Sequence, residues 1–314
     1  MGLFPQRLHE LASSFGIPRL STSKAYIVDF DNGNDDYSGE TWARPMKTIL
    51  AAEAKCVEDR HDTVFVIATD SADTVTEAIV WDKDFTHLIG LGSDLPGVGQ
   101  RCRIQGGATV DVNPVITISG KGCIFRNLQI YNASDAAADS GAVVITANRC
   151  YFENVFFYGM GHATPAARAA AFSLKLTGAA ENYFKNCTIG GDTVIRAAAN
   201  AELIVEVGSS KNVFDNCKFM SHSATAGKFL VHVLTSTTPQ GLNSYKDCLF
   251  YNNWTNWGGE LGHAFNVTGA AATYYVDIVR PRLVGVAGIS NVATHFYLQG
   301  AAAHTDSGIA VNPS

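Results

Sequence analysis

The sequence predicts an all-β protein, a parallel β-helix in which the chain winds through stacked coils of similar length. A six-residue motif recurs that starts with an aromatic residue and carries Asn or Asp at its third position. Successive copies start 27, 32, 30, 31 and 30 residues apart, a fixed period that is typical of repeat architectures. A stretch of alternating apolar and polar residues, typical of a strand, precedes each copy. The copies start at Phe125, Phe152, Phe184, Phe214, Tyr245 and Tyr275.

Equivalent positions of the motif should form ladders, because neighbouring parallel strands lie about 4.8 Å apart. The aromatic residues should stack inside the coil. The third positions should form a ladder in which each side-chain amide bonds to the next. They are Asn127, Asn154, Asn186, Asn216, Asp247 and Asp277. Three later positions, Cys187, Cys217 and Cys248, should stack as small buried hydrophobes. Roughly nine such coils make a rod about 40 Å long.

The second positions of the motif should point outward. Their charges alternate in sign from copy to copy, which favours ion pairing between neighbouring strands. They are Arg126, Glu153, Lys185, Asp215 and Lys246.

The chain divides into three segments: an N-terminal helix and connector (1–24), a strand, turn and helix that form a cap (25–62), and the β-helix (63–314). The first segment has apolar residues at helical spacing before Gly16. Such a short helix must dock, either on its own body or on a partner, and both alternatives stay open. The candidate interface residues are Leu3, Phe4, Leu8, Leu11 and Phe15.

The cap resembles the entry segment of right-handed parallel β-helix proteins of the pectate-lyase-like superfamily. The shared features are the turn from Asn32 to Asp35, the pair Ser38 and Gly39, and a helix near Pro45 that includes Thr48 to Ala52. In that superfamily the helix covers the end of the first coil, which would otherwise be an unpaired sheet edge. The resemblance implies a right-handed β-helix, and the rod also resembles phage-borne β-helix virion proteins.

Composition excludes several classes of function. The net charge of −6 and the absence of a Lys/Arg-rich run argue against nucleic-acid binding. No stretch approaches the roughly 18 apolar residues of a membrane-spanning helix. The start of the chain does not read as a signal peptide, so we expect synthesis in the host cytoplasm. Seven cysteines without paired spacing fit free thiols in a reducing compartment.

One outward column carries candidate catalytic residues. The strands around 174–176, 205–207 and 231–233 would present Lys175, Glu206 and His232 from successive coils, a trio able to do acid–base chemistry. A surface ladder of opposite charges explains the same residues more simply. We therefore predict no catalytic site here.

A dense group of carboxylates, Asp29, Asp31 and Asp35, is the candidate metal site. Carboxylate oxygens are the ligands that Ca²⁺ prefers, but the spacing does not fit an EF-hand loop. In the superfamily that the cap resembles, this turn is structural. No metal and no cofactor are predicted.

The loops between motif copies are rich in Ala, Gly and Ser, poor in charge, and should project from one side of the rod. Trp254 and Trp257 lie in one of them. Such a side favours a contact surface between subunits of a homotrimer. The two tryptophans could instead stack on sugar rings.

These observations favour a non-enzymatic virion structural protein: a phage capsid decoration or fibre-like homotrimer, located in the virion, with a capsid or other virion protein as its partner. The alternative is a carbohydrate-binding or carbohydrate-cleaving β-helix, such as a tailspike depolymerase or a polysaccharide lyase, with polysaccharide as its partner. That alternative needs a carboxylate pair in a groove, and the outward columns offer no clean pair.

Overall fold

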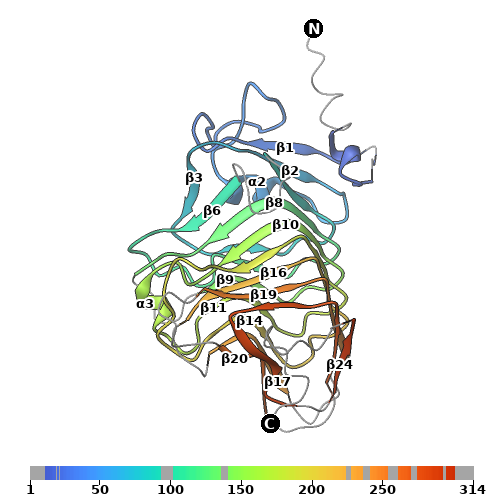
Figure 1. Cartoon of the computed structure of the whole chain (residues 1–314). Helices are drawn as coiled ribbons and strands as arrows, with labels where there is room; N and C mark the ends of the chain where they lie inside the picture. The colour runs from blue at the N-terminus through green and yellow to red at the C-terminus, as the bar shows by residue number, and fades with distance from the viewer. Residues whose placement is uncertain are drawn as a thin grey trace.

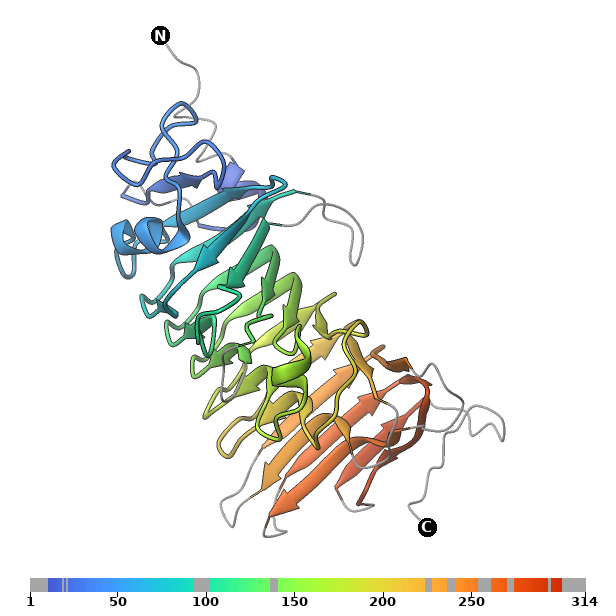
Figure 2. The same cartoon turned by 90° about the vertical axis from the view of Figure 1, so that its left-hand side faces the viewer.

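A computed structural model describes residues 11–18, 20, 22–92, 102–135, 141–223, 228–235, 241–253, 261–269, 274–292 and 295–300. Within these residues the chain forms two parallel sheets that wind together into an elongated rod (Figures 1 and 2). The N-terminal cap lies at one end of the rod and the last coils lie at the other (Figure 1). The predicted parallel β-helix is confirmed.

The larger sheet has 16 strands among the described residues and wraps around one corner of each coil. It comprises β1 (Ala25–Val28), β2 (Thr63–Ile67), β3 (Ala72–Val75), β5 (His87–Leu91), β6 (Cys102–Gly106), β8 (Ile124–Tyr131), β10 (Tyr151–Tyr158), β12 (Tyr183–Lys185), β13 (Thr188–Gly190), β15 (Val213–Asp215), β16 (Lys218–His222), β18 (Leu242–Lys246), β19 (Leu249–Asn253), β21 (Tyr275–Val279), β22 (Arg282–Val284) and β24 (Phe296–Gln299). The strands before the corner pair in the order β1-β2-β5-β8-β10-β12-β15-β18-β21-β24.

The smaller sheet has eight strands among the described residues, and it closes each coil on the opposite side. It comprises β4 (Ile79–Trp81), β7 (Ile116–Ile118), β9 (Gly141–Ile145), β11 (Phe172–Leu176), β14 (Ala201–Val205), β17 (Phe229–Thr235), β20 (Leu261–Gly269) and β23 (Val286–Ser290). Residues 11–14 are helical. The other helices in the described part of the chain are α2 (Ile49–Lys55) in the cap and α3 (Ala163–Ala166) in a loop on the side of the rod (Figure 1).

The corner of the larger sheet depends on a left-handed backbone residue at the third motif position. The residues there have φ between 49° and 56°: Asn127, Asn154, Asn186, Asn216, Asp247 and Arg280. Asn tolerates this conformation better than most residues, which explains its recurrence. Its amide also bonds along the rod, as Asn216 Nδ2 donates to Asn186 Oδ1 at 2.8 Å. Asn154 Nδ2 likewise donates to Asn127 Oδ1 at 3.0 Å. The column of corner positions is confirmed for the first four copies and for Asp247, and the predicted amide bonds are confirmed for these two pairs.

The last motif copy lies three residues further along the chain than predicted. Tyr245 pairs with Ile278, so Arg280 takes the corner position that we expected for Asp277. Tyr275 pairs with Leu242, and 38% of its surface is exposed. The prediction that Tyr275 ends the internal aromatic stack and Asp277 the Asn ladder is therefore wrong. Aromatic spacing alone misplaced this copy, because Ile and Arg replace its aromatic and Asn.

The internal aromatic stack holds neighbouring coils in register. Five buried rings, Phe125, Phe152, Phe184, Phe214 and Tyr245, have neighbouring centroids 4.6–5.1 Å apart and interplanar angles of 9° or less. Cys187, Cys217 and Cys248 follow the corner as fully buried free thiols, as predicted.

The cap closes the first coil with α2. Thr48 is its N-cap and accepts from the backbone N–H of Ala51, and the helix buries Ile49 and Ala52. The helix begins at Ile49 instead of near Pro45, because Met46 forms a β-bridge with Val28. Among the described residues, no helix is long and apolar enough to cross a membrane.

We expect Phe184→Ala, in the middle of the stack, to lower the free energy of unfolding by about 3–5 kcal/mol, because it opens a cavity between two rings. Lys185→Ala is the matched control. That side chain points outward and is 44% exposed, so we expect a change within about 0.5 kcal/mol. Guanidinium denaturation of both variants checks this, and equal midpoints would contradict the role of the stack.

Candidate functional site

The predicted column of Lys175, Glu206 and His232 is only partly assembled. Lys175 pairs with Ile204, and Ile204 pairs with His232, so Glu206 is not in this register. The strand runs from Ala201 to Val205, two residues earlier than we expected, because Leu203 and Val205 fill the core.

Glu206 nevertheless reaches its neighbours from beyond the end of the strand. Its carboxylate lies 3.5 Å from Lys175 Nζ and accepts from Thr177 Oγ1 at 2.7 Å. His232 lies apart and contacts Thr268 Oγ1 at 2.8 Å. Burial lowers the pKa of His232, so its imidazole is neutral at pH 7. The structure thus brings together an ion pair and no acid–base trio.

The carboxylates of the acidic turn accept hydrogen bonds from backbone N–H groups. Asp29 accepts from the N–H groups of Asp31 and Asn32. Asp35 accepts from the N–H groups of Lys47 and Thr48 at 2.8 and 2.9 Å. Within the described ranges, no three His, Cys, Asp or Glu side chains are grouped as metal ligands.

The candidate interface residues lie partly within the described chain. Leu11 and Phe15 pack against a cluster that contains Ile27, Phe65 and Ile89, so both side chains contact the body of their own chain. The Arg126 guanidinium lies 5.1 Å from the centre of the Phe15 ring. Leu3, Phe4, Leu8, Trp254 and Trp257 lie outside the described residues.

The predicted alternating charge column is in register. Arg126, Glu153, Lys185, Asp215 and Lys246 are successive partners across the strands. Glu153 contacts both Arg126 and Lys185. Glu153 thus pairs with the cations of both neighbouring strands, which is the cross-strand pairing that the alternating signs predicted.

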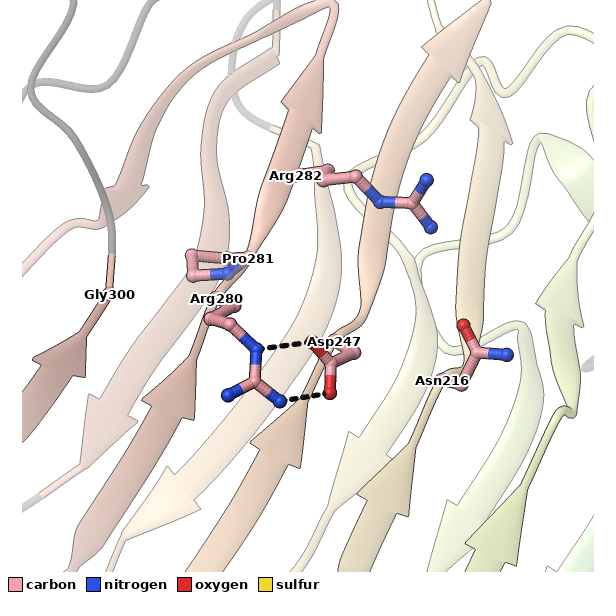
Figure 3. Close-up of a pocket in the computed structure, with 6 residues that line it drawn as sticks. All are labelled: Asn216, Asp247, Arg280, Pro281, Arg282 and Gly300. Atoms are coloured by element: carbon pink, nitrogen blue, oxygen red, sulfur yellow. Dashed lines mark hydrogen bonds and ion pairs between the residues drawn. The ribbon is translucent and has the colours of Figure 1, made fainter.

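A pocket opens at the corner of the last coils, where the Asn ladder ends. Its lining comes from four successive corners and the start of β22: Asn216, Asp247, Arg280, Pro281, Arg282 and Gly300 (Figure 3). Asn gives way here to Asp247, then to Arg280, then to Gly300, which also has a positive φ of 69°. A charged pair therefore occupies the column that carries amides elsewhere.

Asp247 and Arg280 form a two-pronged ion pair in the pocket. Arg280 Nε and Nη2 donate to the two carboxylate oxygens at 2.7 and 2.6 Å (Figure 3). The hydrogen bond from Arg280 lowers the pKa of Asp247, and the nearby charge of Arg282 lowers it further. Asp247 is thus fixed as a carboxylate at neutral pH, and Arg280 keeps other N–H groups for a ligand.

Arg282 adds a second, exposed guanidinium. Its side chain extends across the neighbouring strand, toward the side on which Asn216 lies (Figure 3). Lys218 lies two strands away in the same outward column. Positive charge thus exceeds negative charge around this pocket, although the whole chain carries −6.

Sequence reasoning missed this pocket. It depends on the three-residue displacement of the last copy, which brings Arg280 beside Asp247. The available signal was the run Arg280-Pro281-Arg282, where two cations flank a proline immediately after a strand.

Sequence reasoning also missed a buried ion pair under the side loops. Arg196 and Glu202 are each 1% exposed, and their charged groups are 3.5 Å apart. Arg196 also donates to Asn200 Oδ1 at 2.6 Å and to the Phe229 carbonyl at 2.9 Å. Burial raises the pKa of Glu202 to about 7, against the lowering effects of Arg196 and of the Ser173 hydroxyl. This cluster ties one loop to the smaller sheet.

No protein-family model matches the sequence, and no curated protein matches it. Solved structures do match the fold. A pectin methylesterase from carrot has a TM-score of 0.60 and 13% identity, over 95% of this chain and 91% of that one. The pectate lyase Pel9A has a TM-score of 0.59 and 15% identity, over 92% and 73% of the two chains. A rhamnogalacturonan lyase has a TM-score of 0.59 and 14% identity, over 88% and 73%.

These likenesses show a right-handed parallel β-helix, as the resemblance of the cap implied. They also overturn the prediction of a non-enzymatic virion protein. The matched structures are carbohydrate-active enzymes, which favours the alternative, a carbohydrate-active β-helix. The homotrimer was predicted from the charge-poor side loops, and the capsid partner and the virion location from the analogy to phage proteins. The structure of the described residues and the matched structures give these three predictions no support.

We expect Arg280→Gln to raise the pKa of Asp247 toward that of an ordinary aspartate, because the charge-assisted hydrogen bonds that favour its ionised form are lost. Carboxyl ¹³C chemical shifts followed across a pH titration measure this. Arg149→Gln is the matched control, since Arg149 forms a similar exposed pair with Glu181 at 2.7 Å. It should raise the pKa of Glu181 and leave that of Asp247 unchanged.

We expect Glu202→Ala to lower the free energy of unfolding by about 3 kcal/mol, because it leaves the Arg196 charge buried without its carboxylate. Glu206→Ala, only a few residues away, removes a half-exposed carboxylate and should cost less than about 1 kcal/mol. Thermal denaturation of the two variants side by side checks the difference. A smaller loss for Glu202→Ala than for Glu206→Ala would contradict the structural role of the buried pair.

Proposed function

We propose that this β-helix is a carbohydrate-active protein that binds an acidic polysaccharide at the pocket lined by Asn216, Asp247, Arg280 and Arg282. The observation that carries the proposal is the pair of guanidinium groups at one exposed corner. In the part of the chain that the structure describes, Arg280 forms an ion pair with Asp247, and Arg282 forms none.

The side chains of the pocket suit a sugar acid. A guanidinium binds a carboxylate through two parallel hydrogen bonds, and Arg282 is exposed and available for such a contact. Asp247 and the Asn216 amide supply acceptors and donors for sugar hydroxyls. Because Arg280 holds Asp247 in place, these groups keep their positions before a ligand arrives, which lowers the cost of binding.

The fold supports the same class of ligand. The names of the matched structures specify pectin, pectate and rhamnogalacturonan. Pectate is a polymer of galacturonate units, each with a carboxylate, so it is the natural first probe.

A cation beside a uronate could also assist a reaction that removes a proton from the sugar. When a base removes the proton next to the carboxyl group, negative charge accumulates on that group, and a fixed guanidinium stabilises it. Arg282 could supply this stabilisation. Asp247 is poorly suited to be the base, because its lowered pKa makes it a weak one.

Calorimetric titration with polygalacturonate tests the proposal. We expect binding by the unmodified protein, a loss of affinity of about tenfold or more in Arg282→Gln, and little change in Arg149→Gln, which removes an exposed Arg elsewhere. Fully methyl-esterified polygalacturonate, which lacks the carboxylate charges, should bind much more weakly. The same mixtures are assayed for unsaturated products and for new reducing ends.

Two results would show that the pocket does not bind the carboxylate of the polymer. One is equal affinity for the acidic and the esterified polymer, and the other is an unchanged affinity for polygalacturonate in Arg282→Gln. Failure of the unmodified protein to bind any acidic polysaccharide would refute the proposal.

A further inference from the structure

Two exposed tyrosines lie beside the pocket, on the outer face of the larger sheet. Tyr297 on β24 is 53% exposed and Tyr275 on β21 is 38% exposed. Their ring centroids are 6.1 Å apart, with an interplanar angle of 34°. Other large aromatic residues of this region, such as Tyr245 and Phe250, are fully buried. These two rings are therefore not needed to fill the core.

Polar side chains hold the surroundings of the rings in place. Asp277 pairs with Tyr297 across the strands and accepts from Gln299 Nε2 at 2.9 Å and from Ser244 Oγ at 3.4 Å. The His295 ring meets Tyr275 edge to face, with centroids 5.4 Å apart. The result is an exposed pair of tilted aromatic rings with a carboxylate and an amide beside it.

This pair of rings and the pocket share two strands. Tyr297 precedes Gly300 by three residues, and Asp277 precedes Arg280 by three. Tyr275 precedes Arg280 by five residues. At about 3.3 Å per residue, Tyr297 lies about 10 Å and Tyr275 about 16 Å from the pocket along the strand direction. A chain of sugars that starts at the Arg282 guanidinium and crosses the sheet in this direction would therefore pass over the tyrosines.

We propose that Tyr275 and Tyr297 form a stacking subsite for a second sugar of the polysaccharide bound at the pocket. The C–H bonds on one face of a pyranose ring pack against an aromatic face, and the hydroxyls at its edge reach Asp277 and Gln299. Aromatic residues with a few polar groups beside them are the usual lining of small-molecule sites. This inference rests on the proposed function, since it extends the ligand of the pocket.

Ligands of different length distinguish binding at the pocket from binding at the two tyrosines. Monomeric galacturonate fills the pocket but is too short to reach the rings, whereas an oligogalacturonate spans both. We expect Tyr297→Ala to weaken binding of the oligomer on the order of fivefold to tenfold, and to leave binding of the monomer unchanged. Tyr297→Phe keeps the ring and should bind the oligomer within about twofold of the unmodified protein. Tyr275→Ala should weaken the oligomer in the same way as Tyr297→Ala.

Arg282→Gln provides the comparison, because it should weaken both ligands. If Arg282→Gln weakens binding while both Tyr→Ala variants bind the oligomer at full affinity, the stacking subsite is refuted and the pocket stands. If the unmodified protein binds neither ligand, the proposed function fails and the subsite fails with it. Circular dichroism of each variant confirms that the β-helix is intact, and Tyr297→Phe controls for damage to β24.

Discussion

In-register parallel pairing between successive coils is the constraint on which the rest of this structure depends. Each strand finds its hydrogen-bond partners only in the coils before and after it, so equivalent residues must lie about 4.8 Å apart along the rod. Phe152, Phe184 and Phe214 stack nearly parallel because this spacing brings their rings into contact. The left-handed corner at Asn186 turns the chain at the same point in each coil and keeps the register. A side chain of the wrong size or charge therefore disturbs packing against both the coil before it and the coil after it.

This regularity limits where chemistry can arise. The positions that recur from coil to coil pack the core or turn the corner. In the outward column of alternating charges, Glu153 pairs with both Arg126 and Lys185, so these charges neutralise one another.

 A ligand site needs a charged group that no neighbouring column neutralises, and among the described residues the change of the repeat at the last coils supplies one. At the last coils Asn is replaced by Asp247 and then by Arg280, and Arg282 follows without a neutralising column of its own. The same change leaves Tyr275 outside the core.

Two ion pairs, one buried and one exposed, show that burial decides what a pair of charges does in this protein. Arg196 and Glu202 are sealed under a loop, where their desolvation is offset only by each other and by hydrogen bonds to Asn200, Ser173 and the backbone. They hold the loop and are closed to ligands. Asp247 and Arg280 are exposed at 40% and 61%, so their pairing contributes little stability but orients both groups at the surface.

The amino-acid pattern alone predicts the fold class, the Asn corners, the aromatic stack and the alternating charge column, because each of these features recurs at a fixed period along the chain. It could not place the last copy, since Ile278 and Arg280 replace the aromatic and the Asn that mark the motif, and only backbone pairing with Tyr245 and Asp247 reveals them. It also could not place Glu206 or join Arg196 to Glu202. Those contacts depend on where a strand begins and on how a loop folds back, and both are decided by burial of the core across coils that are about thirty residues apart in the chain.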